Sequence, residues 1–195
     1  TVTGTDTPVA AIVRTVSMDG LTSKGSDYAI PNNASAKSLA LYGLNGGDHA
    51  TLYLYTSRKT DVTVSWIDSK GAQQTNQQEL KANRASAIDL GDVPKSATGI
   101  AIAASEPVSA TAKISDDGPD GQSDFALVNA SAPAKISAIA VPDQSTATVG
   151  FVNTADEDRT AIMTAYDTDG KQVDRREIAI RPSASTSVRI ADIND

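Results

Sequence analysis

Apolar and polar residues alternate along much of this chain in short runs, which are separated by turn residues. In the run at residues 50–56, Leu52 and Leu54 alternate with Tyr53 and Tyr55. A period of two residues is typical of a β-strand with one buried face, and clusters of Gly, Asn, Asp and Ser mark the turns between strands. Runs of this kind lie at residues 38–44, 50–56, 61–67, 74–81, 85–90, 99–105 and 108–114.

These short runs predict an all-β fold, in the form of a small Greek-key β-sandwich of immunoglobulin-like or fibronectin-III-like type. Trp66 is the expected anchor of the core, and the polar run at 74–81 is expected at a sheet edge. The chain contains no cysteine. The sandwich must therefore depend on apolar burial between its sheets, because no disulfide can join them.

The sequence also repeats itself. The phrase SDYAIPNNASA at 26–36 returns as SDFALVNASA at 123–132. Three further stretches match in the same order, each 96 to 100 residues downstream of its partner: 8–20 with 107–118, 50–71 with 147–170, and 85–93 with 185–193. The shared order and nearly constant offset predict an internal duplication that produces two tandem β-sandwiches. Runs of the second copy lie at 135–141, 147–153, 160–166, 172–180 and 186–192.

The duplication divides the chain into predicted parts. They are an N-terminal strand pair (1–18), a connector (19–36), a first β-sandwich (37–115), a second connector (116–132) and a second β-sandwich (133–195). The second copy ends before the counterparts of its last two strands, whereas residues 1–16 align with those strands. We therefore expect the N-terminal strands to complete the second sandwich, because without them it would expose long edges. Pairing with a neighbouring molecule is the alternative, which leaves a monomer and a strand-exchanged dimer both open.

Charge and composition exclude several classes of partner. The formal net charge is −7, and the 17 basic residues are scattered along the chain. Nucleic acids and anionic membranes require concentrated Lys and Arg, so neither is an expected partner. No stretch approaches the roughly 20 apolar residues of a membrane-spanning helix. The chain begins at Thr1 without methionine or a recognisable signal peptide, so we expect a mature or trimmed form.

Candidate catalytic groups are few. His49, the single histidine, follows Asp48 in the loop GGDHA, but the chain contains no G-x-S-x-G elbow and the second copy has VPDQSTA in place of this loop. The acidic stretch DEDR at 156–159 could supply a carboxylate pair for glycoside hydrolysis, yet its pattern is that of a solvated loop. We predict no catalytic residues and no enzyme, with a hydrolase as the remote alternative.

Two acidic loops are candidates for Ca²⁺. Asp167, Asp169 and Asp174 surround Gly170, and the stretch DDGPDGQSD at 116–124 gathers four further aspartates. Neither loop has the D-x-D-x-D-G pattern and distal Glu of an EF-hand. Hairpin turns favour Asp and Gly for reasons of backbone geometry alone, so a turn is the preferred interpretation. Calcium is the one candidate ion, and no other cofactor is predicted.

Surface aromatic residues suggest a second kind of site. Tyr42, Tyr53 and Tyr55 fall within one short segment. If Leu52 and Leu54 point inward, Tyr53 and Tyr55 share the outer face of their strand, where their rings could stack on sugars. The simpler interpretation is that tyrosines favour strands and cover sheet faces. The tyrosines are thus candidate ligand-binding residues.

The repeated phrase lies between the predicted sandwiches and follows a Pro-Val strand in both copies. It retains an aspartate and an aromatic residue, as Asp27 and Tyr28 in the first copy and Asp124 and Phe125 in the second. We interpret the phrase as a joint, with the aromatic ring closing one end of a sandwich or the seam between domains. Ligand binding by the phrase is the alternative.

The stretch at 61–114, DVTVSWIDSKGAQQTNQQELKANRASAIDLGDVPKSATGIAIAASEPVSATAKI, resembles repeats of secreted or envelope-attached actinobacterial proteins of unknown function. Such repeats have V-x-W-x-D-x-x-G, then a small-residue A-S strand, then a strand pair with G-h-x-h-x-S-x-x-P-V, where h is apolar. The resemblance extends to the second copy, although that copy lacks the Trp. Its motifs are structural, so it assigns no site residues.

The resemblance implies an extracellular or cell-envelope location and a non-enzymatic role, whether structural, adhesive or in protein interaction. A protein or a cell-wall glycan is the expected partner. Binding of carbohydrate by the surface tyrosines is the alternative function. These expectations rest on the resemblance and on the tyrosine pattern.

Overall fold

The computed structural model describes residues 13–19, 22–29, 35–117, 123–135, 137 and 148–193. These residues form antiparallel β-strands and one short 3-10 helix, η1 (Ile190–Ile193), which confirms the all-β prediction. The strands are β1 (Val13–Asp19), β2 (Thr22–Ala29), β3 (Ala36–Tyr42), β4 (His49–Thr56), β5 (Thr60–Ile67), β6 (Ala72–Leu80), β7 (Arg84–Asp92), β8 (Gly99–Asp117), β9 (Ser123–Asn129), β10 (Thr148–Val152), β11 (Arg159–Tyr166), β12 (Gln172–Ile180) and β13 (Ser185–Arg189). The predicted strand at 135–141 falls largely outside the described residues.

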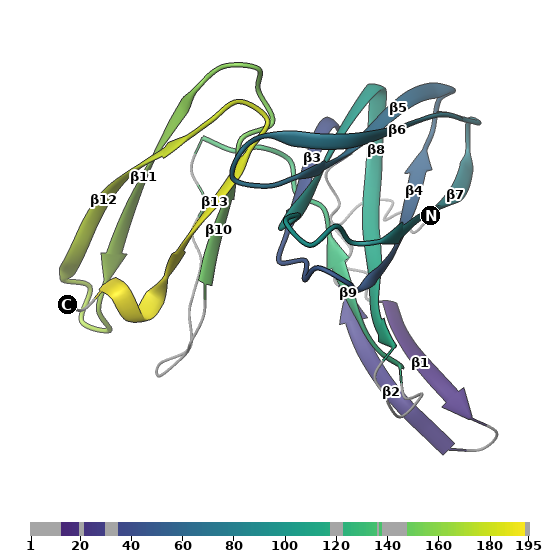
Figure 1. Ribbon diagram of the computed structural model, residues 1–195, viewed down its shortest axis with the longest axis horizontal. Coiled ribbons are helices and arrows are strands. Elements are labelled where there is room, and N and C mark those ends of the chain that lie inside the picture. Colours follow the sequence, from purple (N-terminus) through teal and green to yellow (C-terminus); the bar gives the residue numbers. More distant parts are fainter. Residues whose placement is uncertain are drawn as a thin grey trace, which may run out of the picture.

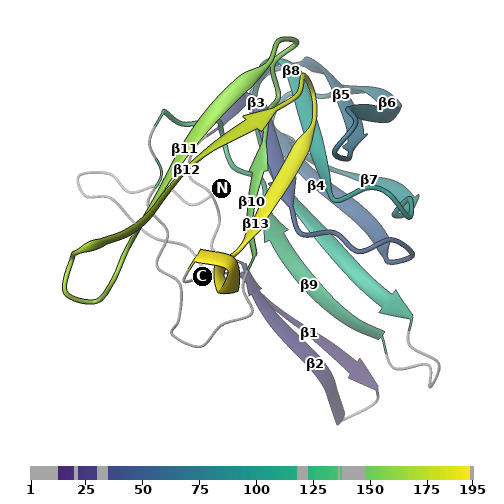
Figure 2. The same ribbon diagram turned by 60° about the vertical axis from the view of Figure 1, so that its left-hand side comes forward.

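The strands fall into two lobes, which Figure 1 shows side by side. The first lobe consists of β3 to β9, and the second lobe of β10 to β13 with η1. In the first lobe the strand order is β6-β5-β8-β4-β7, and β3 and β9 also pair with β8. The β1–β2 hairpin extends from the first lobe and lies beside β9 (Figures 1 and 2).

The long strand β8 organises the first lobe because it has a different set of neighbours in each half. Its first half, 99–104, lies between β3 and β5. Its second half pairs with β4 over residues 108–115 and with β9, on the other edge, over residues 111–117. Even-numbered residues from Ile100 to Ile114 are the more buried ones in both halves. The same face of β8 therefore contacts the core along its whole length. The sequence predicted two strands separated by Glu106 and Pro107, but the structure has one.

Hydroxyl groups maintain hydrogen bonding where β8 passes from one set of neighbours to the other. Thr60 Oγ1 accepts a hydrogen bond from the backbone N–H of Glu106 at 2.9 Å and lies 2.9 Å from Ser105 Oγ. Ser105 Oγ in turn accepts from the N–H of Asp61 at 3.0 Å. Pro107 has no N–H to donate to a strand ladder, so a proline here leaves no donor unpaired. These side-chain bonds allow the strand to continue across Pro107.

A single apolar cluster fills the first lobe. It contains alternate residues of the strands, among them Leu52 and Leu54 of β4 and Val62, Val64 and Trp66 of β5. The inward direction of Leu52 and Leu54 and the burial of Trp66 confirm what the alternation predicted. Burial of each large aliphatic side chain stabilises the fold by about 1.5–3 kcal/mol. The remaining members include Leu39, Leu41, Leu80, Ile88, Ile100, Ile102, Val108 and Ile114.

The edge strand β6 is polar, as predicted for residues 74–81, and occupies one end of the sheet order. Near the end of this strand, Glu79 Oε2 lies 2.6 Å from Lys59 Nζ. The hydrogen bond and the charge of Glu79 raise the pKa of Lys59. Polar and charged side chains on an edge strand discourage pairing with further strands.

The second lobe contains two separate strand pairs, β10–β13 and β11–β12. Among its described residues, the buried side chains are Ile180 and Ala184, together with the polar Asn153 and Ser185. Asn153 Nδ2 donates to the carbonyl oxygens of Glu157 at 2.8 Å and Arg181 at 3.0 Å. The hydrogen bonds of this buried amide thus join the loop after β10 to the backbone after β12. The first lobe is stabilised instead by apolar packing.

The two lobes meet along β3 and β10. A Cβ built on Gly150 would lie 2.0 Å from Cδ1 of the Tyr42 ring, so the ring rests directly on the glycine backbone. Ser38 Oγ donates to Thr154 Oγ1 at 2.9 Å beside this contact. Only a residue without a side chain leaves room for the ring at this distance.

The hairpin turn after β5 provides a second set of bonds between the lobes. The backbone oxygen of Asp68 accepts from the N–H of Ser185 at 2.9 Å, and the hydroxyls of Thr98 and Ser185 lie 2.6 Å apart. The carboxylate of Asp68 accepts from the N–H groups of Lys70 at 2.6 Å and Gly71 at 3.1 Å. This side chain therefore fixes the turn whose backbone contacts the second lobe.

The N-terminal strand pair is only partly described. Val13–Asp19 forms β1 and pairs with β2, and within the described residues it does not pair with a strand of the second lobe. Residues 1–12 of the predicted pair lie outside the described residues. The prediction that this pair completes the second sandwich stays a prediction.

Leu52→Ala tests the location of the core. We expect it to lower the free energy of unfolding of the first lobe by about 2–5 kcal/mol, because it leaves a cavity in the apolar cluster. Trp66 is the single tryptophan and lies in that lobe, so its fluorescence during urea unfolding reports the change. The half-buried Val149, which aligns with Leu52, provides the control. An equal shift of the fluorescence midpoint in Val149→Ala would contradict the asymmetry between the lobes.

Gly150→Ala tests the contact between the lobes. The added methyl group collides with the Tyr42 ring, and we expect a loss of about 1–3 kcal/mol in thermal unfolding followed by circular dichroism. In a Tyr42→Ala background the same substitution should cost clearly less, because the ring is gone. Additive effects of the two substitutions would show that Tyr42 and Gly150 do not interact.

Candidate functional site

The outer face of β4 carries two of the three candidate tyrosines. Tyr53 is 45% exposed, and Tyr55 lies on the same face and is half-buried. The residues directly opposite Tyr53 on the neighbouring strands are Ala87 and Thr111. Directly opposite residues of an antiparallel pair lie on the same face, so small side chains flank the Tyr53 ring. The result is an open sheet face with an aromatic ring at its centre.

Tyr42 does not share this face. It ends β3 and packs on Gly150, at the contact between the lobes. The structure thus brings Tyr53 and Tyr55 together and gives Tyr42 a structural contact. Spacing along the chain could not separate these roles, because the partner of Tyr42 is more than a hundred residues away in the sequence.

His49 lies at the start of β4 between two aspartates of β7. Its Nε2 is 3.0 Å from Asp89 Oδ1, and its Nδ1 is 3.4 Å from Asp92 Oδ1. Sequence reasoning had connected His49 only with its neighbour Asp48. The two aspartates were missed because they become neighbours only through the register of β4 with β7.

The surroundings of His49 are those of an exposed sheet end. All three side chains of this group are well exposed. Ser115, the residue opposite His49 on β8, donates its hydroxyl to the backbone oxygen of His49 at 3.4 Å rather than to the ring. The arrangement is a pair of polar side-chain contacts that join β4 to β7.

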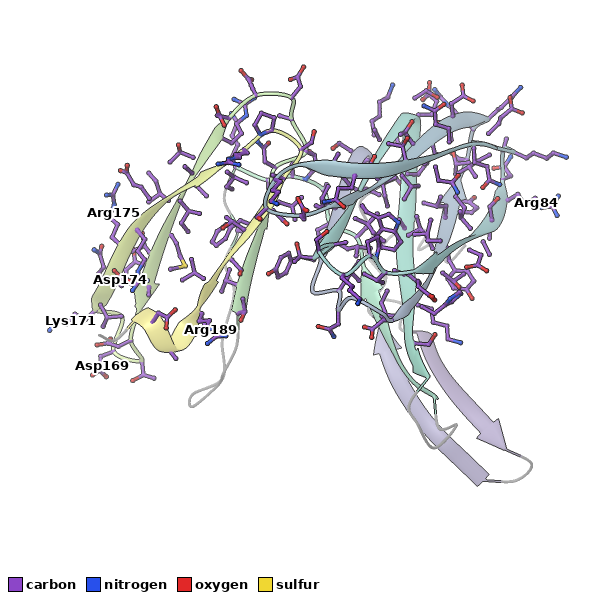
Figure 3. All side chains as sticks on the ribbon, in the orientation of Figure 1. Arg84, Asp169, Lys171, Asp174, Arg175 and Arg189 are labelled. Carbon is purple, nitrogen blue, oxygen red and sulfur yellow. The ribbon has the colours of Figure 1, made fainter. Side chains whose placement is uncertain are left out.

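The acidic residues near Gly170 take part in the β11–β12 hairpin. Asp167 Oδ1 accepts from the N–H groups of Asp169 at 3.0 Å and Lys171 at 2.8 Å. Asp174 Oδ2 accepts from Arg176 Nε at 2.5 Å. Figure 3 shows Asp169 and Lys171 at the tip of the hairpin, with Asp174 and Arg175 further along it. Within the described part of the chain, no three His, Cys, Asp or Glu side chains are grouped to hold a metal ion.

The other proposed calcium loop cannot be placed in full, because residues 118–122 lie outside the described residues. The connector residues that border it are in strands. Asp124 and Phe125 lie in β9, and their counterparts Asp27 and Tyr28 lie in β2. Since β2 lies beside β9, the two copies of the repeated phrase are neighbours in space. Their role as a joint stays a prediction.

The β11–β12 hairpin exposes apolar side chains that sequence reasoning did not single out. Ile162 is 58% exposed, Tyr166 63% and Val173 45%. Together with Tyr53 they are the large apolar residues that the described part of the chain exposes. We name the surface formed by Ile162, Tyr166 and Val173 the hairpin face. Alternation along β11 places Ile162 and Tyr166 on one face of the strand, and Ile162 lies opposite Glu177 of β12.

Among the described residues, no helix has the length and apolar character that a membrane crossing requires. No curated protein matches the sequence. A crystal structure of the protein Thermotoga maritima 1070 is similar at 13% sequence identity and a TM-score of 0.40, over 50% of this chain and 94% of that one. A family model described as a family of unknown function, DUF5719, matches residues 1–191. The chain therefore belongs to the DUF5719 family.

Proposed function

We propose that this chain is a non-catalytic module of the cell envelope, located outside the cytoplasm, which acts by binding another protein. The hairpin face is the observation that carries the proposal. Several large apolar side chains exposed on one sheet face have a cost in water, and where they persist they commonly mark an interaction site. Its three apolar side chains lie on one hairpin of a lobe that buries few of its own.

We also propose that the two lobes derive from tandem immunoglobulin-like β-sandwiches produced by duplication. Strand pairing supports this, because β4–β7 and β5–β6 in the first lobe correspond in sequence to β10–β13 and β11–β12 in the second. Both hairpins turn at an aspartate whose Oδ1 accepts two backbone N–H groups, Asp68 in one and Asp167 in the other.

Two further positions support the duplication. Leu80 pairs with Thr60 at the end of one hairpin and Ile180 pairs with Arg159 at the end of the other, and both apolar side chains are buried. Thr56 and Asn153 are both buried polar residues, and each accepts a hydrogen bond from the backbone N–H two residues further along. Matched local bonds at matched sequence positions are what a common origin would leave.

The envelope location rests on the resemblance of residues 61–114 to repeats of envelope-attached actinobacterial proteins. The acidic composition and the absence of cysteine are compatible with it. A structural or adhesive role fits a module whose surfaces are sheet faces and strand edges.

Carbohydrate binding is the second candidate function, and the β4 face favours it. Tyr53 is 45% exposed and its directly opposite neighbours, Ala87 and Thr111, are small, so part of the side chain is accessible to a sugar. Aromatic rings on a flat sheet surface offer apolar area to the C–H groups of a polysaccharide. A cell-wall glycan would be the ligand.

The triple variant Ile162→Ser/Tyr166→Ser/Val173→Ser tests the protein-binding proposal. We expect the wild type to sediment with envelope fractions of the source bacterium and the triple variant to lose at least tenfold in apparent affinity. Protease treatment of the fractions should abolish wild-type binding, because the partner is a protein. Glu177→Gln, on the same face, keeps the apolar residues and should bind as the wild type does. Undiminished binding by the triple variant would rule out the hairpin face.

Tyr53→Ala/Tyr55→Ala tests the carbohydrate alternative. If that alternative holds, the double variant loses binding to protease-treated cell walls and to a glycan array, whereas Thr51→Ala on the same strand keeps it. We expect the double variant to match the wild type in envelope binding. Specific loss in the double variant, with binding retained by the triple hairpin variant, would replace the protein-binding proposal by a glycan-binding one.

A further inference from the structure

In the described part of the chain, the strand β10 has a strand neighbour on one edge only. Its counterpart in the first lobe, β4, pairs with β7 on one side and with the second half of β8 on the other. Within the described residues, β10 pairs with β13 alone. Among the described residues, no strand pairs with the edge of β10 that corresponds to the β8 side of β4, which makes this edge a candidate for pairing with a further strand.

The strand β1 has the complementary open edge. The sequence PVAAIVRTVSMDG at 8–20 aligns with PVSATAKISDDG at 107–118, which ends β8. The strand β1 pairs antiparallel with β2 and the end of β8 pairs antiparallel with β9, although the registers differ: Tyr28 lies opposite Arg14, whereas Phe125 lies opposite Ser115. The opposite side of β8 pairs with β4, but within the described residues β1 has no strand on that side. In the sequence alignment, β10 is thus the counterpart of β4, and β1 is the counterpart of the part of β8 that pairs with β4.

The two edges lie apart within one chain. The strand β1 forms a hairpin with β2, and β2 lies beside β9 of the first lobe. The strand β10, by contrast, contacts β3, where the two lobes meet. Figure 1 shows β1 and β10 apart. A second copy of the chain can bring a β1 edge to β10 without moving the hairpin away from β9.

We infer that β10 pairs in antiparallel fashion with β1 of a second copy of this chain. The inference rests on the duplication in the proposed function and names a partner for the second lobe. Main-chain hydrogen bonds would supply the affinity, as in other cases of strand addition to a sheet edge. Because each copy offers one edge of each kind, the contact is head-to-tail and extends into chains of molecules or closes into a ring.

The register of this pair follows from the first lobe. Thr51 lies opposite Lys113 in the β4–β8 pair, and Leu52 lies opposite Ala112. The alignment, counted back from the matched Asp19 and Asp117, transfers these pairs to Thr148 with Thr15 and to Val149 with Arg14. Opposite Cα atoms of an antiparallel pair lie about 4.5–5.5 Å apart, which is within the range that a disulfide spans.

Cysteine cross-linking tests the inference, and the chain contains no native cysteine to interfere. The Thr15→Cys variant and the isotope-labelled Thr148→Cys variant are mixed and oxidised, and mass spectrometry identifies the linked peptides. We expect a mixed dimer linked through residues 15 and 148, at least fivefold above the yield of Thr15→Cys with Glu177→Cys, the matched control on exposed β12. Arg14→Cys with Val149→Cys provides a second pair in the same register, should one variant fail to fold.

The double variant Thr15→Cys/Thr148→Cys distinguishes the source of the strand. We expect a ladder of linked oligomers, and light scattering of the wild type should show a mass that rises with concentration. A disulfide formed only within one chain would overturn the inference in favour of closure by the chain's own strand. Monomers at every concentration, with no linked product, would overturn it as well. Envelope binding by such a monomer would leave the proposed function intact, so the two can fail separately.

Discussion

The first lobe depends on the continuity of β8 across Pro107. One half of this strand hydrogen-bonds with β3 and β5 and the other half with β4 and β9, so every other strand of the lobe is linked to it directly or through one neighbour. Continuity is feasible because the hydroxyls of Thr60 and Ser105 replace ladder hydrogen bonds at the crossing. The buried face of β8 then supplies apolar side chains to the whole cluster.

The described part of the second lobe has no strand of this kind, which accounts for its different character. Its strand pairs match those of the first lobe, yet β10 and β11 lack a neighbour on one side within the described residues. Apolar residues such as Met163 and Ile178 consequently remain half-buried, and Ile162 and Tyr166 are exposed. The amide of Asn153 compensates in part, because its directional bonds tie the loop at 153–157 to the backbone at Arg181. A lobe of this kind is suited to receive a strand or a partner surface.

Alternation of apolar and polar residues predicted most strands, the inward face of β4 and the edge position of β6, since these depend on local periodicity. The break expected at Glu106 and Pro107 was wrong because the compensating hydroxyl of Thr60 belongs to another strand. The aspartates around His49 and the packing of Tyr42 on Gly150 depend on register and on contact between lobes. Neither property has a signal in local sequence, so neither was predicted.

The contact of Tyr42 with Gly150 also bears on the order of the two lobes. Gly150 aligns with Tyr53, so one lobe carries its own ring at the position where the other receives a ring from its neighbour. Under the duplication proposed above, the two lobes are not interchangeable, because a tyrosine at the position of Gly150 would collide with the Tyr42 ring. A single position without a side chain then determines which lobe can follow the other.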